Sequence, residues 1–187
     1  MALNKATLKN DIINFMGVEG GSSSASDFAT NLFNVYESYA LGAADLSQDT
    51  PLNFPSKSAA LSSLAGVMNS ISVPDMTNSL AATQLSAALG VALVTFWTTV
   101  MFGIAIPMPP MVVEISAITI PPFGNSGVVG PIMIPGLSTT HGDIASAADV
   151  WANAMDAFTK TVIVTITGLM PSPTGTIPAV PIIGPII

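Results

Sequence analysis

The sequence predicts an α+β fold: N-terminal helices, then two pseudo-repeated helix–strand units that form a small, mainly antiparallel sheet, and an extended Pro-rich C-terminal arm. Three observations lead to this prediction. Apolar residues recur at helical spacing in the N-terminal part, the hydrophobic period changes to two after Pro110, and the uncharged segment 170–187 contains five prolines. The chain accordingly divides into an N-terminal helical region (1–74), a helix–strand core (75–170) and the arm (171–187).

The composition narrows the classes of function. Only 8% of the residues are charged, against roughly a quarter in an average soluble domain. The net charge is -7 and arginine is lacking, so phosphate backbones would be repelled and nucleic acid is not an expected partner. The lack of cysteine excludes disulfides and thiolate metal sites. Asp11 interrupts the first apolar turns, so no secretory signal is expected there.

Three amphipathic helices are expected in the N-terminal region, over residues 5–17, 25–39 and 58–70. Ser24 and Asp27 match the S-x-x-D pattern of a capping box, which places the start of the second helix. The side chains expected to face the core are Leu8, Ile12 and Phe15 in the first helix, Phe28, Leu32, Val35 and Tyr39 in the second, and Leu61, Leu64, Ala65 and Met68 in the third.

The segment 79–110 contains no charged residue and can be interpreted in two ways. As one apolar helix over residues 79–106 it would be long enough to span a bilayer. A comparison of the chain with itself at an offset of 62 residues instead predicts a core helix followed by a strand over residues 99–106. Biased apolar sequence can also produce such a match by chance. The matched pairs include Phe96 with Phe158, Thr99 with Thr161 and Val100 with Val162.

The rest of the core is expected to hold strands on either side of one helix. Residues 111–120 alternate with a period of two, which places Glu114 on the solvent face of a strand, and residues 128–134 form a second strand interrupted at Pro131. The β-branched run 161–167 predicts a third strand. The helix between them begins near Asp143, and the residues expected to face solvent on it are Asp143, Asp149, Asp156 and Lys160.

No catalytic, cofactor or metal site is predicted, and an enzyme is not expected. His141 is the only histidine and lies close to Asp143, but neighbours in sequence seldom form a catalytic triad and the G-x-S-x-G elbow is lacking. One histidine without cysteine offers no metal-ligand cluster. Glu114 has no acidic partner at a suggestive spacing, and Trp97 and Trp151 are expected to fill the core.

The C-terminal arm provides the expected interaction surface. Proline lowers the entropy lost on ordering and isoleucine supplies apolar area, which suits a segment laid along a partner. The leading hypothesis is therefore a structural assembly protein whose partners are other copies of itself and other structural proteins. The residues expected at this interface are Ile177, Pro178, Val180, Pro181, Ile182, Ile183, Pro185, Ile186 and Ile187.

The sequence resembles small structural proteins of the virions of tailed bacteriophages. The features that carry the resemblance are the N-terminal helices, the β-branched strand, the helix end Phe96-Trp97-x-Thr99 and the ending Gly184-Pro185-Ile186. The resemblance implies a capsid, neck, tail or baseplate component that is assembled in the host cytoplasm, is present in many copies in the virion, and has no catalytic residues. The alternative hypothesis is a membrane-associated protein with residues 79–106 inserted as a single span.

Overall fold

The computed structural model describes residues 3–17, 24–43, 51–71, 79–102, 112–119, 124–139, 143–172, 175–178 and 182–185. Six α-helices account for most of this part of the chain. A π-helical turn, η2 (Gly124–Val129), leads directly into the fifth. The α-helices are α1 (Lys5–Gly17), α2 (Ala25–Ala40), α3 (Lys57–Ser70), α4 (Ser79–Trp97), α5 (Gly130–Leu137) and α6 (Ile144–Thr159).

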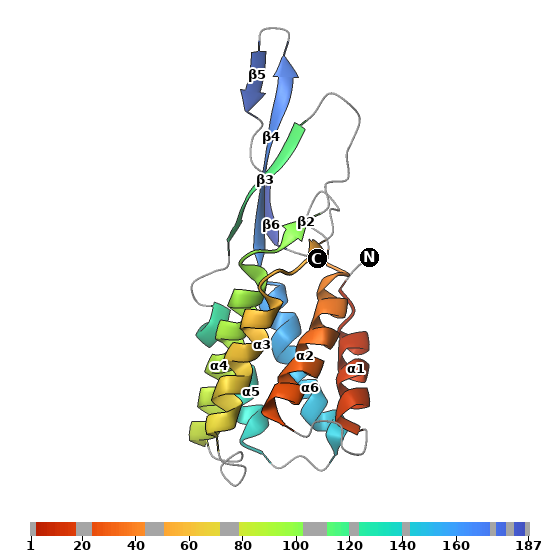
Figure 1. The fold of residues 1–187 in the computed structure, drawn as a ribbon, viewed down its shortest axis with the longest axis vertical. Coiled ribbons are helices and arrows are strands. Elements are labelled where there is room, and N and C mark those ends of the chain that lie inside the picture. Colours follow the sequence, from red (N-terminus) through yellow and green to blue (C-terminus); the bar gives the residue numbers. More distant parts are fainter. Residues whose placement is uncertain are drawn as a thin grey trace.

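The helices form a closed ring (Figure 1). Each of α1 to α5 packs against the helix that follows it, and α6 packs against both α5 and α1. Helices α2, α4 and α6 run in the same direction, so that their C-terminal ends lie together at one end of the bundle. The other helices run the opposite way, as expected for neighbours joined by short connections.

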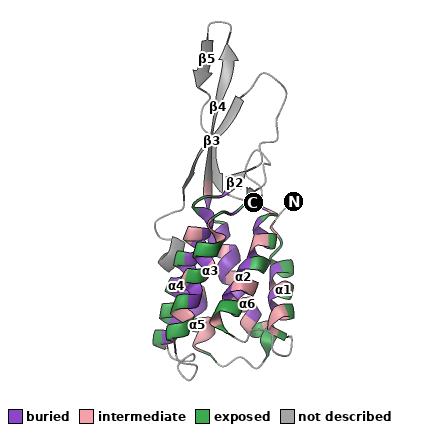
Figure 2. Cartoon of the chain, in the orientation of Figure 1, coloured by how far each residue is buried: buried purple, intermediate pink, exposed green. Residues whose placement is uncertain are grey.

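The inner faces of the helices meet in one hydrophobic core, which Figure 2 shows in purple. On α2 the buried stripe follows the i, i+3, i+4 spacing of an amphipathic helix. It consists of Ala29, Leu32, Phe33, Tyr36, Tyr39 and Ala40. This stripe is broader than the predicted one, because Phe33 and Tyr36 are completely buried whereas Phe28 and Val35 are only partly buried.

Side-chain oxygens cap the starts of two helices. The Ser24 hydroxyl accepts a hydrogen bond of 3.1 Å from the backbone N–H of Asp27, which is one of the two bonds of the predicted capping box of α2. At the start of α6 the Asp143 carboxylate accepts a bond of 2.6 Å from the backbone N–H of Ser146. In both cases a side-chain oxygen satisfies one of the backbone donors that the first helical turn leaves without a partner.

The predicted α+β fold is wrong, because the core is a bundle of helices. Wherever the structure describes burial, the core residues lie on a helix or in a segment beside one. The two expected helix–strand units also do not share a sheet: β2 (Met101–Phe102), after α4, pairs with β1 (Pro51–Asn53), whereas β4 (Ile163–Ser172), after α6, pairs elsewhere. The apolar stripes of the helices cover one another around the ring and bury the core without a sheet.

The remaining strands lie beyond the end of the bundle at which α4 and α6 finish (Figure 1). Strand β4 pairs antiparallel with β3 (Val112–Thr119) on one side and with β5 (Gly175–Pro178) and β6 (Ile182–Pro185) on the other. The end of the chain is thus not the extended arm that was predicted, because two of its segments fold back along β4. The prolines of these two short strands lie at the edge of the pairing, where a missing N–H is tolerated.

The strand predicted over residues 128–134 is also wrong. These residues complete η2 and form most of α5. Pro131 occupies the first turn of α5, directly after η2, and proline is common at the first positions of helices. A Gly-Pro pair that was interpreted as a break in a strand is therefore the start of a helix.

Helix α4 occupies the first part of the uncharged segment. It ends at Trp97 and β2 begins at Met101, and α6 and β4 show the corresponding pair of boundaries at Thr159 and Ile163, 62 residues further along. Among the described helices α4 alone is long and apolar enough to cross a membrane, but 61% of the window from Leu80 to Trp97 is buried inside the bundle. A core helix of a soluble protein passes the same test, so length and composition do not make α4 a membrane span.

Candidate functional site

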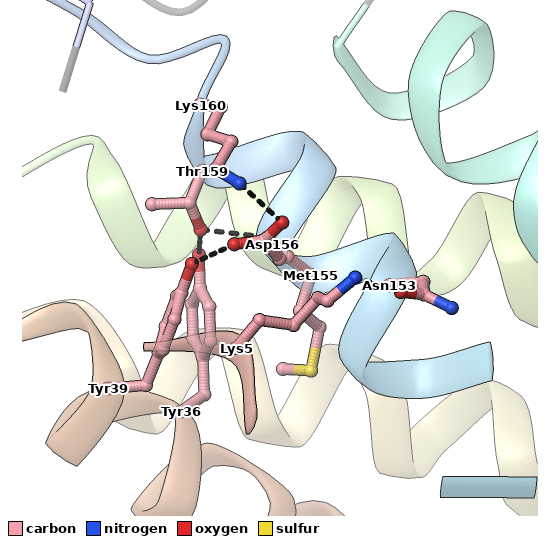
Figure 3. A network of polar contacts seen from close by, with 8 residues as sticks. All are labelled: Lys5, Tyr36, Tyr39, Asn153, Met155, Asp156, Thr159 and Lys160. Atoms are coloured by element: carbon pink, nitrogen blue, oxygen red, sulfur yellow. Dashed lines mark hydrogen bonds and ion pairs between the residues drawn. The ribbon is translucent and has the colours of Figure 1, made fainter. Parts of the chain in front are cut away.

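The most elaborate group of polar side chains lies where α2, α4 and α6 end together (Figure 3). We call it the Tyr36 cluster. Two tyrosines of α2 reach side by side toward the last turn of α6, and the indole of α4 joins them. Its members are Tyr36, Tyr39, Trp97, Asp156, Thr159 and Lys160.

The central bonds of the Tyr36 cluster have a defined direction. The Thr159 hydroxyl donates to the carbonyl of Met155 at 2.8 Å, so it must accept from the Tyr36 hydroxyl at 2.6 Å. The Tyr36 oxygen in turn accepts from the indole N–H of Trp97 at 2.8 Å. Each of these three side chains is completely buried. The chain of bonds therefore satisfies every buried donor along it.

The outer part of the Tyr36 cluster holds a buried acid. Asp156 is only 6% exposed. One of its carboxylate oxygens accepts from the Tyr39 hydroxyl at 2.7 Å and the other pairs with the Lys160 ammonium at 2.8 Å. The prediction that Asp156 faces solvent is wrong, because Tyr39 and Lys160 together supply the donors that a buried carboxylate requires.

The environment keeps both phenols protonated. Burial raises the pKa of Tyr36 above its ordinary value. Burial, and then the hydrogen bond to Asp156, raise the pKa of Tyr39. A general base or a tyrosinate nucleophile needs the opposite shift. The two tyrosines therefore act as fixed donors that join α2 to α6.

An aromatic layer supports this cluster. The Phe96 ring lies 5.0 Å from the Tyr36 ring and 4.2 Å from the Phe54 ring, centroid to centroid. Phe54 also meets Trp97 edge to face at 5.2 Å. Such pairs hold rings in defined positions. The last turn of α4 is therefore held by Tyr36 of α2 and by Phe54.

Every lysine of the chain is engaged within the bundle. Lys9 pairs with Asp149 at 2.9 Å and Lys5 donates to Asn153 at 2.8 Å, so both of these contacts join α1 to α6. Lys57, the first residue of α3, pairs with Glu37 of α2 at 2.6 Å. The fourth lysine is the partner of Asp156 described above. Each of the four lysines thus has a partner within the described part of the bundle, and the chain contains no arginine.

The acid between α1 and α6 is held in its ionised form. The hydrogen bond from Lys9 lowers the pKa of Asp149, and the amide of Asn153 contributes a further bond of 2.9 Å. Asp149 was predicted as a solvent-facing helix charge, and its side chain is indeed 45% exposed. Its pairing with α1 was not predicted.

Four of the residues considered for chemistry lie within the described part of the chain, namely Trp97, Glu114, Asp143 and Trp151. Asp143 caps α6. Trp97 and Trp151 fill the core, the latter against Phe28 with ring centroids 5.3 Å apart. Glu114 lies in β3 opposite Thr167 of β4. His141 lies outside the described residues.

The predicted interface residues are divided between two strands and undescribed positions. Ile177 and Pro178 belong to β5, and Ile182, Ile183 and Pro185 belong to β6. The predicted positions that lie outside the described residues are Val180, Pro181, Ile186 and Ile187.

The described side chains show no group of three His, Cys, Asp or Glu residues that could hold a metal ion. No protein family, curated protein sequence or solved structure matches the chain. The fold and the site thus define a closed helical bundle. Its Tyr36 cluster joins three helices, and the buried hydrogen-bond donors of that cluster have acceptors within the bundle.

Proposed function

We propose that the protein is a structural assembly protein that acts through contacts between subunits and is a component of a virus particle, assembled in the host cytoplasm. The observation that carries the proposal is that the polar side chains of the Tyr36 cluster and the lysines bond to other groups of the same bundle. The buried bonds of the Tyr36 cluster and all four lysines join helix to helix or residues within a helix. Such an arrangement stabilises a rigid body and offers no reactive group to a substrate.

The last 27 residues of the chain supply the second argument. Residues 161–187 contain no Asp, Glu, Lys or Arg and are rich in Ile, Val and Pro. Strands β4, β5 and β6 from this segment lie beyond the end of the bundle. Uncharged strands with edges need cover to avoid uncontrolled association, and neighbouring subunits provide it in an assembly.

The test removes the end of the chain. The full chain, expressed without detergent, is expected to form particles far larger than its 19.1 kDa monomer in analytical ultracentrifugation. A chain ending at Ser172 is expected to keep the helical circular dichroism signal and to lose these particles. A matched control, Ala6→Lys at an exposed position of α1, has its charge far along the chain from the deleted segment and separates a specific loss from a change in solubility. Equal assembly of the shortened and full chains would count against the interface, and a full chain that stays monomeric would count against the function.

The membrane hypothesis is the second candidate, and the length of α4 favours it. The burial of most of α4 against its neighbours argues the other way. Fractionation of expressing cells distinguishes the two. Recovery only in the membrane fraction would support insertion and overturn the assembly proposal.

A further inference from the structure

Strand β4 has two separate partners on the side that faces away from β3. Strand β6 pairs with the first half of β4, and β5 pairs with the second half. Leu169 and Ile166 are three positions apart on β4. Their partners, Pro178 in β5 and Ile182 in β6, are four positions apart. The register therefore shifts by one residue, and β6 is an element of its own rather than a continuation of β5.

The two pairings also differ in how local they are. Ser172 of β4 pairs with Gly175 of β5, so these two strands form a tight hairpin that stays within one chain. The pairs of β6 join residues that lie much further apart, such as Ile163 with Pro185. Strand β6 is therefore the part that can pass to another copy while the hairpin remains in place.

The half of β4 that accepts β6 begins directly at the end of the helical core. Thr159, the last residue of α6, is bonded to Tyr36. The backbone N–H of Thr161 donates to the Phe158 carbonyl at 2.9 Å. The N–H of Val162, a completely buried residue, donates to the Thr159 carbonyl at 3.0 Å. The bundle thus holds the start of β4 in place, and a preorganised acceptor lowers the cost of binding.

Strand β6 is short and separable. It has four residues, of which the last is Pro185, whereas strands commonly have about five or six. Among the described elements β4 is its main packing partner. The backbone pairs that β6 makes with its own β4 can therefore be made equally with β4 of another copy. Exchange of an identical element between copies is a low-cost route to association.

The structure itself identifies the occupant of this edge of β4. The segment seated on it is Ile182–Pro185, so a second copy brings a sequence that fits. Neither this segment nor residues 163–166 of β4 contain a charged residue, so the exchange places no like charges in the contact. The acids that give the net charge of -7 repel other copies, and salt at about 0.15 M screens such repulsion beyond roughly 8 Å.

We propose that copies of this chain associate by strand exchange, in which each copy gives its β6 to β4 of the next copy. The hairpin of β4 and β5 stays within each copy. Because the segment that is given and the edge that receives it are different surfaces, the contact is head-to-tail and can continue from copy to copy. This inference rests on the proposed assembly function and names the segment that passes between subunits.

Cysteine variants of the full chain test the exchange, because the native chain has no cysteine. Thr165 pairs with Ile183, and residues directly opposed on antiparallel strands are close enough for a disulfide. A Thr165→Cys chain and an Ile183→Cys chain, mixed in urea, refolded together and then oxidised, are expected to become linked to each other. The matched control replaces the second chain with Ile177→Cys, which should stay unlinked because Ile177 pairs with Met170. Equal linking in the two mixtures would overturn the proposal.

A chain that carries both Thr165→Cys and Ile183→Cys shows where the bond forms. Strand exchange predicts a ladder of covalently linked chains on a non-reducing gel, and bonds confined to single chains would overturn it. Neighbouring pairs of an antiparallel ladder alternate in geometry, so Ile166→Cys with Ile182→Cys provides the second pair to be measured. Failure of both pairs to link would contradict the register of β6 on β4, and the proposal with it.

A chain that ends at Pro178 lacks β6 and keeps the hairpin. This short chain can receive β6 but cannot give one, so it should terminate a head-to-tail series of copies. When it is refolded together with the full chain, sedimentation velocity is expected to show smaller particles as its share rises. An equal amount of additional full chain is the control. Particles of unchanged size would count against exchange.

The outcomes separate this inference from the proposed function. Linked dimers that never grow into larger particles would support the exchange of β6, and would contradict both the head-to-tail order and the assembly function. Large particles in which the chain with both cysteines forms bonds only within itself would support the assembly function and overturn the exchange.

Discussion

Tyr36 has its position at the crossing of three helix ends because its hydroxyl can accept from one helix and donate to another. Trp97 supplies the donor from α4, and Thr159 supplies the acceptor on α6. A phenylalanine at this position would fill the same volume and lose both bonds. The hydroxyl therefore contributes specificity to a core whose packing energy comes from the rings.

Tyr36→Phe is expected to destabilise the protein by about 1–3 kcal/mol, because the indole N–H of Trp97 would be left buried without an acceptor. Thr159→Val removes the other end of the bond and is expected to cost a similar amount. Urea denaturation of the two variants and of the double variant tests the coupling between them. The double variant should lose less than the sum of the single losses; strictly additive losses would contradict the bond.

The Lys9 and Asp149 pair predicts a dependence of stability on pH. Because its pKa is lowered in the folded state, Asp149 binds a proton less readily there than in the unfolded chain, whose value is near 3.8. The stabilisation is therefore present above that value and is lost as the pH falls through the folded pKa. Lys9→Met should lower the free energy of unfolding at pH 7 by less than about 1 kcal/mol, since the pair is partly exposed.

The control for this pair is Lys9→Arg, which keeps the charge and should keep the pH dependence. Denaturation midpoints measured from pH 3 to pH 7 should show the Met variant converging with the wild type at the acidic end. A constant difference over the whole range would mean that packing of the lysine stem, and not its charge, is responsible.

At the scale of elements, two glycines on helices make opposite predictions. At Gly136 of α5 a Cβ would lie 2.6 Å from Cγ1 of Val150 on α6, and a β-branched side chain in a helix has little freedom to move away. Gly136→Ala is therefore expected to cost about 1–3 kcal/mol through overpacking.

Gly66→Ala is the matched substitution, since the space around it is open. It is expected to stabilise α3 by about 0.5–1 kcal/mol through helix propensity. Thermal unfolding of both variants, at a concentration where the chain is monomeric, measures the contrast. Equal effects at the two positions would show that α5 does not approach α6 closely.

The positions of the helices with one apolar stripe could be predicted from the sequence. The contacts that these helices make with one another could not. The bounds of α1 follow from the spacing of Leu8 and Ile12, and the start of α2 follows from Ser24. Asp156 was misjudged because a charge at the edge of an apolar stripe is normally solvated, and its partner Tyr39 lies 117 residues away in the sequence. Local spacing carries no information about such a partner.

The error over α5 has a different origin. Gly-Pro pairs usually mark turns or strand breaks, and Pro131 is compatible with either a strand edge or a first helical turn. The packing of this segment between α4 and α6 decides that it is a helix, and such packing is a tertiary effect. The same is true of the strands, since the spacing that predicts a strand near Glu114 does not indicate whether a sheet belongs to the core.

For the whole molecule, closure of the ring predicts cooperative unfolding. Leu8 and Ile12 of α1 are completely buried, and α1 packs against both α2 and α6. Removal of residues 1–17 would uncover both of these helices. We expect the shortened chain to bind a hydrophobic dye and to lose its sharp thermal transition.

The chain that ends at Ser172 is the control for this deletion, because none of the residues it lacks belongs to the described core. It should keep a sharp transition close to that of the full chain. An unchanged melting temperature after removal of α1 would contradict the closed ring.

Closure between the first and last helices also has a consequence for the order of folding. The bond from Lys5 to Asn153 joins residues 148 positions apart, so a ribosome must complete nearly the entire bundle before α1 meets this partner. Contacts of such high sequence separation slow folding, because the loop between them must close first. Until then the apolar face of α1 has only α2 to cover it. We therefore expect the final step of folding to be the docking of α6, after synthesis, and the nascent chain to depend on chaperones until that step is complete.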